Sequence, residues 1–184
     1  MKKIKAYFFQ KDLEEFKKLG VGKPTQRTSS ILFVIDNQNQ KAGAMIDRIN
    51  TLMSSSKFRR YFLIYDPSNQ LGEANKHSSY TKKDLNWRSG FSNLDAISLL
   101  KQAHHLVLFP QNIYRADFKF IAEASCSNFR IGHQAQALNY GLDIGFDLKN
   151  DSISEFIQQL SIVSPDLLER KGKKKSVLEK IDKS

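Results

Sequence analysis

Short apolar runs that end at a polar residue are the feature that most constrains how this chain can fold. Residues 31–35 are five consecutive apolar residues, and Asp36 follows them directly. Residues 61–66 (Tyr-Phe-Leu-Ile-Tyr-Asp) repeat this form, and residues 106–109 (Leu-Val-Leu-Phe) make a third run. Strands that are buried on both faces of a parallel sheet have this appearance. The runs therefore predict a sheet that is covered by helices on both sides.

Segments with helical spacing of their apolar residues separate these strands. They cover residues 42–53, 93–103, 114–125 and 151–163. Residues 129–132 and 141–146 predict two more short strands, residues 134–139 between them predict a turn, and residues 78–81 fit a short edge strand. Strands that alternate with helices imply right-handed crossovers. We therefore predict one α/β three-layer domain, Rossmann-like in outline, with a mostly parallel sheet of about five strands.

Composition places the chain among ordinary soluble proteins. It has 184 residues, of which 40% are hydrophobic and 26% are charged, and this length suits one domain. No apolar run approaches the roughly 18 residues that span a bilayer. A signal peptide needs an apolar stretch of roughly 7–15 residues, which the N-terminus lacks. We therefore predict a cytoplasmic protein. The single cysteine, Cys126, excludes an intrachain disulfide and a multi-cysteine metal site.

Basic residues are concentrated at the two ends of a chain whose net charge is +10. Residues 1–28 hold eight Lys and Arg against three acidic residues, and residues 164–184 hold seven against four. The middle of the chain is therefore nearly neutral. We predict a basic amphipathic helix and linker over residues 1–24, the α/β domain over residues 25–164, and a basic, flexible tail over residues 165–184.

The tail contains a cluster of basic residues that could bind RNA or the ribosome. Its members are Arg170, Lys171, Lys173, Lys174 and Lys175. A run of cations attracts nucleic acid phosphates. Charge at a chain end more commonly keeps a protein soluble, so nucleic-acid binding through the basic ends is an alternative to the main hypothesis.

Polar residues at the ends of the predicted strands are the candidate ligand-binding site. Asp36 and Asp66 each follow a strand, and the carboxyl ends of parallel strands line the ligand crevice of open α/β sheets. Two carboxylates there could exchange protons or bind Mg²⁺, although aspartate is also a common turn residue. In an aromatic-rich loop, Trp87 could stack on a base while Arg88 binds a phosphate. Arg130, inside a short strand, could bind an anion or pair with a carboxylate.

No motif in the sequence points to a cofactor or a metal ion. The phosphate-binding patterns Gly-x-x-x-x-Gly-Lys-Ser/Thr and Gly-x-Gly-x-x-Gly are missing. His104 and His105 would need further ligands to hold a metal ion, and the other two histidines, His77 and His133, are distant in sequence. We therefore expect no cofactor and no metal site.

These observations favour a non-catalytic binding or interaction module over an enzyme. Its partner would be a protein or a small ligand, neither of which the sequence identifies. The alternative is a small binder or enzyme for ligands of the nucleotide or phosphosugar class that uses Asp36, Asp66, Trp87 and Arg130 at the carboxyl edge of the sheet.

From about residue 3 to residue 165 the chain resembles a family of small Bacteroidota proteins with a domain of unknown function. The shared features are a basic N-terminal helix, a strand at 31–36, Leu85-Asn86-Trp87, a strand at 106–108, the block Asn128 to Gly132, and the run Tyr140 to Ile144. This resemblance implies the order of the elements and brings no activity with it.

A second, local resemblance covers residues 104–133. This stretch is similar to the N-terminal half of heptosyltransferase-type glycosyltransferases, where a strand, a helix and an Arg-Ile-Gly strand (here residues 130–132) occur in the same order. Those enzymes bind their sugar nucleotide with the help of a second Rossmann-like domain, for which 184 residues leave no room. The resemblance therefore implies the fold and not the activity.

Overall fold

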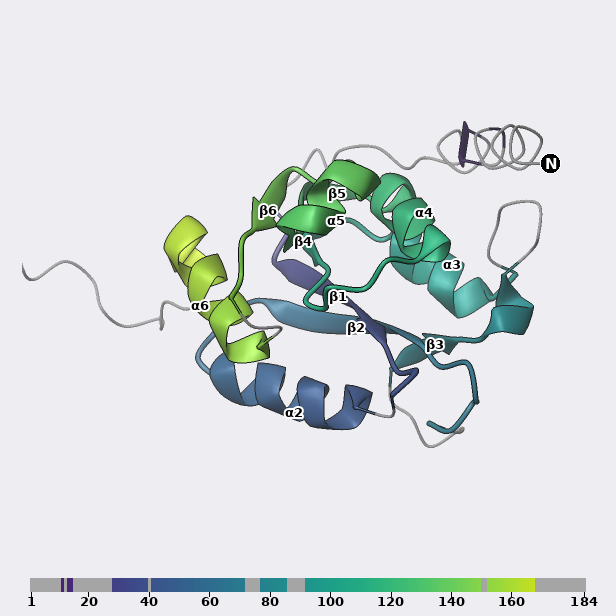
Figure 1. Cartoon of the computed structure of the whole chain (residues 1–184), viewed down its shortest axis with the longest axis horizontal. Coiled ribbons are helices and arrows are strands. Elements are labelled where there is room, and N and C mark those ends of the chain that lie inside the picture. Colours follow the sequence, from purple (N-terminus) through teal and green to yellow (C-terminus); the bar gives the residue numbers. More distant parts are fainter. Residues whose placement is uncertain are drawn as a thin grey trace, which may run out of the picture.

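Figure 1 shows the computed structural model of the chain. It describes residues 11, 13, 14, 28–39, 41–71, 77–85, 92–149 and 152–167. Three predictions lie outside the described residues: most of the N-terminal helix, the loop with Trp87 and Arg88, and the basic cluster of the tail.

Six strands form one parallel sheet in the part of the chain that the structure describes. They are β1 (Ser30–Asp36), β2 (Arg59–Tyr65), β3 (Ser78–Tyr80), β4 (His104–Leu108), β5 (Ser127–His133) and β6 (Ile144–Phe146). Their order across the sheet is β3-β2-β1-β4-β5-β6, and every neighbouring pair is parallel. This is the order of a Rossmann fold. The predicted α/β, Rossmann-like fold is confirmed, with six strands in place of about five.

Helices cover both faces of this sheet (Figure 1). They are α2 (Ala42–Leu52), α3 (Leu94–Lys101), α4 (Ala116–Ala124), α5 (Gln134–Tyr140) and α6 (Ile153–Val163), with two short 3-10 helices, η1 (Lys82–Asp84) and η2 (Pro165–Leu167). Helices α2 and α6 pack on one face, and α3, α4 and α5 pack on the other. No helix among the described residues has the length and apolar character needed to cross a membrane.

The prediction of a turn at residues 134–139 is wrong, because this segment is helix α5. Seven residues are too few to display a helical period in the sequence. At its start the His133 N–H donates to Oε1 of Gln136 over 3.1 Å, and at its end Gly141 adopts the left-handed conformation, with φ of 65°. Local capping at both ends therefore defines a helix that the apolar pattern does not reveal.

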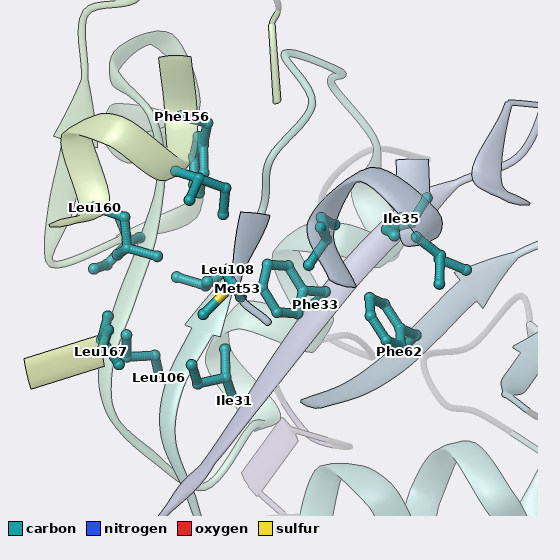
Figure 2. Close-up of a cluster of buried hydrophobic side chains, with 14 of the residues drawn as sticks. Ile31, Phe33, Ile35, Met53, Phe62, Leu106, Leu108, Phe156, Leu160 and Leu167 are labelled. Carbon is teal, nitrogen blue, oxygen red and sulfur yellow. The ribbon is translucent and has the colours of Figure 1, made fainter. Parts of the chain in front are cut away.

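Two apolar cores lie on opposite faces of the sheet, and strand β1 contributes to both. Alternate residues Ile31, Phe33 and Ile35 face α2 and α6, where Figure 2 shows them among the side chains of that cluster. Leu32 and Val34 belong to the cluster on the α3 and α4 face. All five side chains are fully buried, as expected for an inner strand of a doubly covered sheet.

Leu13 is the one apolar residue of the predicted N-terminal helix whose burial the structure describes. It is fully buried and belongs to the cluster on the α3 and α4 face. This apolar position therefore packs on the domain.

Two glycines allow α5 to pack closely against the sheet. A Cβ atom at Gly145, in β6, would lie 2.7 Å from the Cα atom of Gln134 and 2.8 Å from the Cβ atom of Ala137. A Cβ atom at Gly132, in β5, would lie 2.6 Å from Cδ1 of Leu142. All three distances are shorter than van der Waals contact. The atoms near Gly145 are fixed to helix α5, so this position requires the absence of a side chain, whereas at Gly132 the end of the Leu142 side chain would have to shift.

His104 is a buried core residue. It is fully excluded from solvent at the start of β4, where Nε2 lies 2.9 Å from the carbonyl oxygen of Leu99 and Nδ1 lies 3.3 Å from Oγ of Ser30. Burial lowers the pKa of His104, because the charged imidazolium loses its hydration. Among the described residues, no three side chains of the kinds that bind metal ions come together.

We expect the free energy of unfolding to decrease as the pH falls below about 6.5. The unfolded chain takes up a proton on His104 near that pH, whereas the folded chain, in which the pKa of His104 is lowered, resists it. The pKa of His105 is also lowered by burial and adds an effect of the same sign. Urea unfolding of the His104→Gln variant should depend less steeply on pH between about 6.5 and 5 than that of the wild type. Parallel pH profiles would contradict this role of His104.

Candidate functional site

The strand order reverses between β1 and β4, which are neighbours at the centre of the sheet. In open α/β folds, the ligand crevice lies outside the carboxyl ends of the strands at this point. Here β1 ends at Asp36, β2 is followed by Asp66, and β4 is followed by residues 109–111. The candidate site is built from these three strand ends.

The side chain of Gln111 bridges the point where the strand order reverses. Its Oε1 accepts a hydrogen bond from the backbone N–H of Asp36 over 2.7 Å, and its Nε2 donates to the carbonyl oxygen of Asp36 over 3.0 Å. The Gln111 loop is itself held by Gln136, whose Nε2 donates to the carbonyl oxygens of Gln111 and Ile113 over 2.7 and 2.8 Å. One amide side chain therefore satisfies the backbone groups at the end of β1 that a bound ligand could otherwise use.

Both carboxylate oxygens of Asp36 are bound by the chain itself. Oδ1 accepts from the backbone N–H of Gln38 over 2.6 Å, and Oδ2 lies 3.3 Å from Nη1 of Arg115. The side chain of Asp36 is 2% exposed and that of Arg115 is 16% exposed. Arg115 also pairs with Asp117, with Nε 3.1 Å from Oδ1 and Nη2 3.1 Å from Oδ2. One guanidinium group thus compensates two carboxylates.

Two tyrosines complete the surroundings of this arginine. The Cζ atom of Arg115 lies 3.4 Å from the centre of the Tyr65 ring, a cation–π contact. The hydroxyl of Tyr80 donates to Oδ2 of Asp117 over 2.7 Å. Burial, together with the charge of Asp117, raises the pKa of Tyr80 well above its usual value, so the phenol keeps its proton. We call these five residues (Asp36, Tyr65, Tyr80, Arg115 and Asp117) the Arg115 cluster.

Asp66 is engaged in the same manner as Asp36. It is buried, its Oδ1 accepts from Nδ2 of Asn37 over 3.2 Å, and its Oδ2 accepts from the backbone N–H of Leu71 over 2.8 Å. Asn37 in turn accepts the backbone N–H of Ala42, at the start of α2, over 3.0 Å. Asn37 therefore links the ends of β1 and β2 to the first turn of α2.

Of the five residues predicted for this site, the structure describes three, and it brings two of these together. Asp36 and Asp66 lie at adjacent strand ends and are linked through Asn37, as described above. Arg130 lies within β5, opposite Val107 of β4. The described residues include no contact between Arg130 and either aspartate, and the arginine that pairs with Asp36 is Arg115.

Arg130 makes its polar contacts through its backbone. Its N–H donates to Oδ2 of Asp143 over 2.7 Å, and its carbonyl oxygen accepts from the N–H of Asp143 over 2.9 Å. Nε of Arg130 is buried and has no hydrogen-bond partner among the described residues. The Asp143 carboxylate therefore binds the backbone of Arg130, and the ion pairs among the described residues include none from the Arg130 side chain.

Sequence reasoning missed the residues that complete this edge, which are Gln111, Arg115, Asp117 and Tyr80. The one local sign is that Arg115 stands at the N-cap of α4, where the helix dipole disfavours a cation, but only the structure shows this, because the sequence places Arg115 inside a predicted helix over residues 114–125. A cation at that position indicates that it has another partner. The partner itself, Asp36, is separated from Arg115 by 79 positions in the sequence.

An open cleft lies beside the Arg115 cluster, at the carboxyl ends of β2 and β3. Its volume is about 630 Å³. We call it the lysine cleft. Its described lining residues are Pro67, Ser68, Asn69, Thr81, Lys82, Lys83 and Asp84.

The sequence comparisons identify a family and no relative of established activity. No curated protein and no solved structure matches the chain. The family of unknown function DUF6913 matches residues 2–162 of the 184. This agrees with the predicted resemblance to a domain of unknown function over nearly the whole chain. The chain therefore belongs to the family of unknown function DUF6913.

Proposed function

We propose that the protein is a non-catalytic binding module that works in the bacterial cytoplasm. The observation that supports this proposal most directly is that its strand-end carboxylates are buried and held by contacts within the chain. Each carboxylate oxygen of Asp36 and of Asp66 already accepts a hydrogen bond from the chain.

A general base needs a free lone pair within reach of the proton that it removes, and a metal site needs several free oxygens. Asp36 is 3% exposed and Asp66 is 1% exposed, so neither presents its remaining lone pairs to a ligand without disturbing contacts that hold the ends of β1 and β2. Tyr80, the one phenol of the Arg115 cluster that donates to a carboxylate, is buried and keeps its proton. These groups therefore act as structural supports for the edge of the sheet.

A binding role fits what remains at this edge. The lysine cleft is open to solvent, and its volume is in the range of small-molecule sites, roughly 300–1,000 Å³. The alternative function, a small binder or enzyme for ligands of the nucleotide or phosphosugar class, would use the same edge, and as an enzyme it would need Asp36 or Asp66 as a reacting group.

Incubation of the full chain with a mixture of sugar phosphates and nucleotides separates these functions. We expect mass spectrometry to recover every compound chemically unchanged, even when the protein is present in equimolar amount. Conversion of any compound that is lost in Asp36→Asn or Asp66→Asn, while circular dichroism shows that the variant is folded, would establish an enzyme and overturn the proposal.

Other predictions extend this proposal and rest on the sequence alone. RNA or ribosome association would use the basic cluster of the tail, and Trp87 and Arg88 would add a stacking and a phosphate contact. The origin in Bacteroidota and the local likeness to heptosyltransferase-type enzymes also stay predictions. None of them requires the strand-end aspartates to react.

A further inference from the structure

We propose that the lysine cleft binds the phosphate group of a small phosphate monoester. This inference rests on the proposed function and gives the binding module a site and a ligand class. It draws on three properties of the cleft: walls that the chain holds in place, two lysines that form no ion pair with a described residue, and a position at the ligand edge of the fold.

The first wall, formed by the turn after β2, is anchored by a buried carboxylate. The N–H of Asn69 donates to the carbonyl oxygen of Asp66 over 3.1 Å, which closes the turn. The carboxylate of Asp66 then holds the N–H of Leu71 over 2.8 Å on the far side of the turn. Ser68 and Asn69 are exposed at its tip, where a hydroxyl and an amide group can donate to a ligand.

The second wall, residues 81–84 after β3, is closed by its own side chains. Oδ2 of Asp84 accepts from both N–H and Oγ1 of Thr81, over 2.7 and 2.9 Å. Oγ1 of Thr81 also accepts the N–H of Lys83 over 3.2 Å. Asp84 is the one carboxylate among the described lining residues; its Oδ2 is engaged by its own segment, and it forms no ion pair with either lysine.

Lys82 and Lys83 are the cations of the cleft. Both are exposed, and neither forms an ion pair with a described residue. By contrast, Arg115 is committed to Asp36 and Asp117. Lysine ammonium groups bind phosphate as mobile point charges, and hydroxyl and amide donors add directional hydrogen bonds. This set of donors fits a phosphate monoester better than a neutral ligand.

The position of the cleft follows from the closure of the usual crevice. Gln111 bridges the carboxyl end of β1, and the Arg115 cluster lies beside it. Among the described residues, an open cleft lies instead at the ends of β2 and β3. A ligand would thus meet the same edge as in other Rossmann-like folds, but at neighbouring strands.

Isothermal titration calorimetry on the full chain, at one fixed ionic strength, tests this site. The probes are glucose 6-phosphate, adenosine monophosphate, inorganic phosphate and glucose. We expect at least one of the two esters to bind and glucose not to bind. The ester that binds more tightly shows whether the site prefers a sugar phosphate or a nucleotide. The affinity for inorganic phosphate shows how much the phosphate group contributes by itself.

The double variant Lys82→Gln/Lys83→Gln should weaken binding of that ester by at least about tenfold, because two charge-assisted contacts are lost. The matched control, Lys57→Gln/Lys149→Gln, removes two exposed lysines elsewhere in the described chain and should leave the affinity within about twofold. Three results would overturn the inference: no ester binds, the Lys82/Lys83 variant binds as tightly as the wild type, or the control loses as much affinity.

These results are distinguishable from a failure of the proposed function. If an ester binds through Lys82 and Lys83 but is converted to a product, the phosphate site is supported and the protein is an enzyme. If no ester binds, the phosphate site is refuted, but the proposal that Asp36 and Asp66 do not react still stands.

Discussion

Replacing Arg115 with methionine is expected to lower the free energy of unfolding by about 3 kcal/mol. Methionine keeps much of the aliphatic length of arginine but removes the charge. Asp36, whose side chain is 2% exposed, would then retain a negative charge without its cation. Asp117 would lose the same partner, and the contact between the guanidinium and the Tyr65 ring would disappear. Removing one member of a buried ion pair costs more than the pair contributes, because the remaining charge stays poorly hydrated.

Lys119→Met is the matched control, because it removes a cation from the same helix. Lys119 is 3.8 Å from Glu123, in an i,i+4 pair at the surface, and its side chain is 44% exposed. Such a pair contributes roughly 0.5 kcal/mol or less. Urea unfolding followed by circular dichroism measures both variants. Equal losses of stability in Arg115→Met and Lys119→Met would refute the structural role of the Arg115 cluster.

Truncating Phe156 to alanine is expected to cost about 4 kcal/mol of unfolding free energy. Phe156 is fully buried in the cluster that joins α6 to the sheet, and Figure 2 shows its position near Leu160. Its ring centre lies 5.3 Å from that of Phe146 and 6.0 Å from that of His133. The loss of these ring contacts and the cavity that replaces the ring both destabilise the folded state.

Ile162→Ala, on the same helix, tests whether burial causes this effect. Ile162 is 66% exposed, so its truncation should change stability by no more than about 0.5 kcal/mol. Thermal unfolding should place the Phe156→Ala midpoint clearly below those of wild type and Ile162→Ala. A midpoint for Phe156→Ala near that of the wild type would mean that α6 does not depend on this ring.

The burial of Phe156 can be predicted from the sequence, whereas the ion pairs of Arg115 cannot. Phe156 belongs to an apolar pattern with helical spacing over residues 151–163, so its burial follows from the sequence. Arg115 looks like a surface residue in the first turn of the helix predicted over residues 114–125, and its cap position, the only local sign of another role, is known from the structure alone. Helix α5 was missed for a related reason, because capping contacts rather than periodic apolar residues define it.

By itself the sequence determined the fold class and the edge where the candidate site lies. Bare apolar runs alternate with amphipathic segments, and only strands buried between two helical layers satisfy that pattern. Asp36 and Asp66 stand at the ends of such runs, which places them at the carboxyl edge once the sheet is parallel.

Only the tertiary structure decided what those aspartates do. The partners of Asp36, Gln111 and Arg115, are 75 and 79 positions away in the sequence. They meet Asp36 because β4 pairs directly with β1 and the chain then turns into α4. The spacing of apolar residues indicates which faces of each segment are buried. Pairing between distant polar groups depends instead on strand order and loop geometry. The position of the two aspartates at the edge of the sheet is therefore predictable from the sequence. The contacts that hold their carboxylates form only in the assembled sheet.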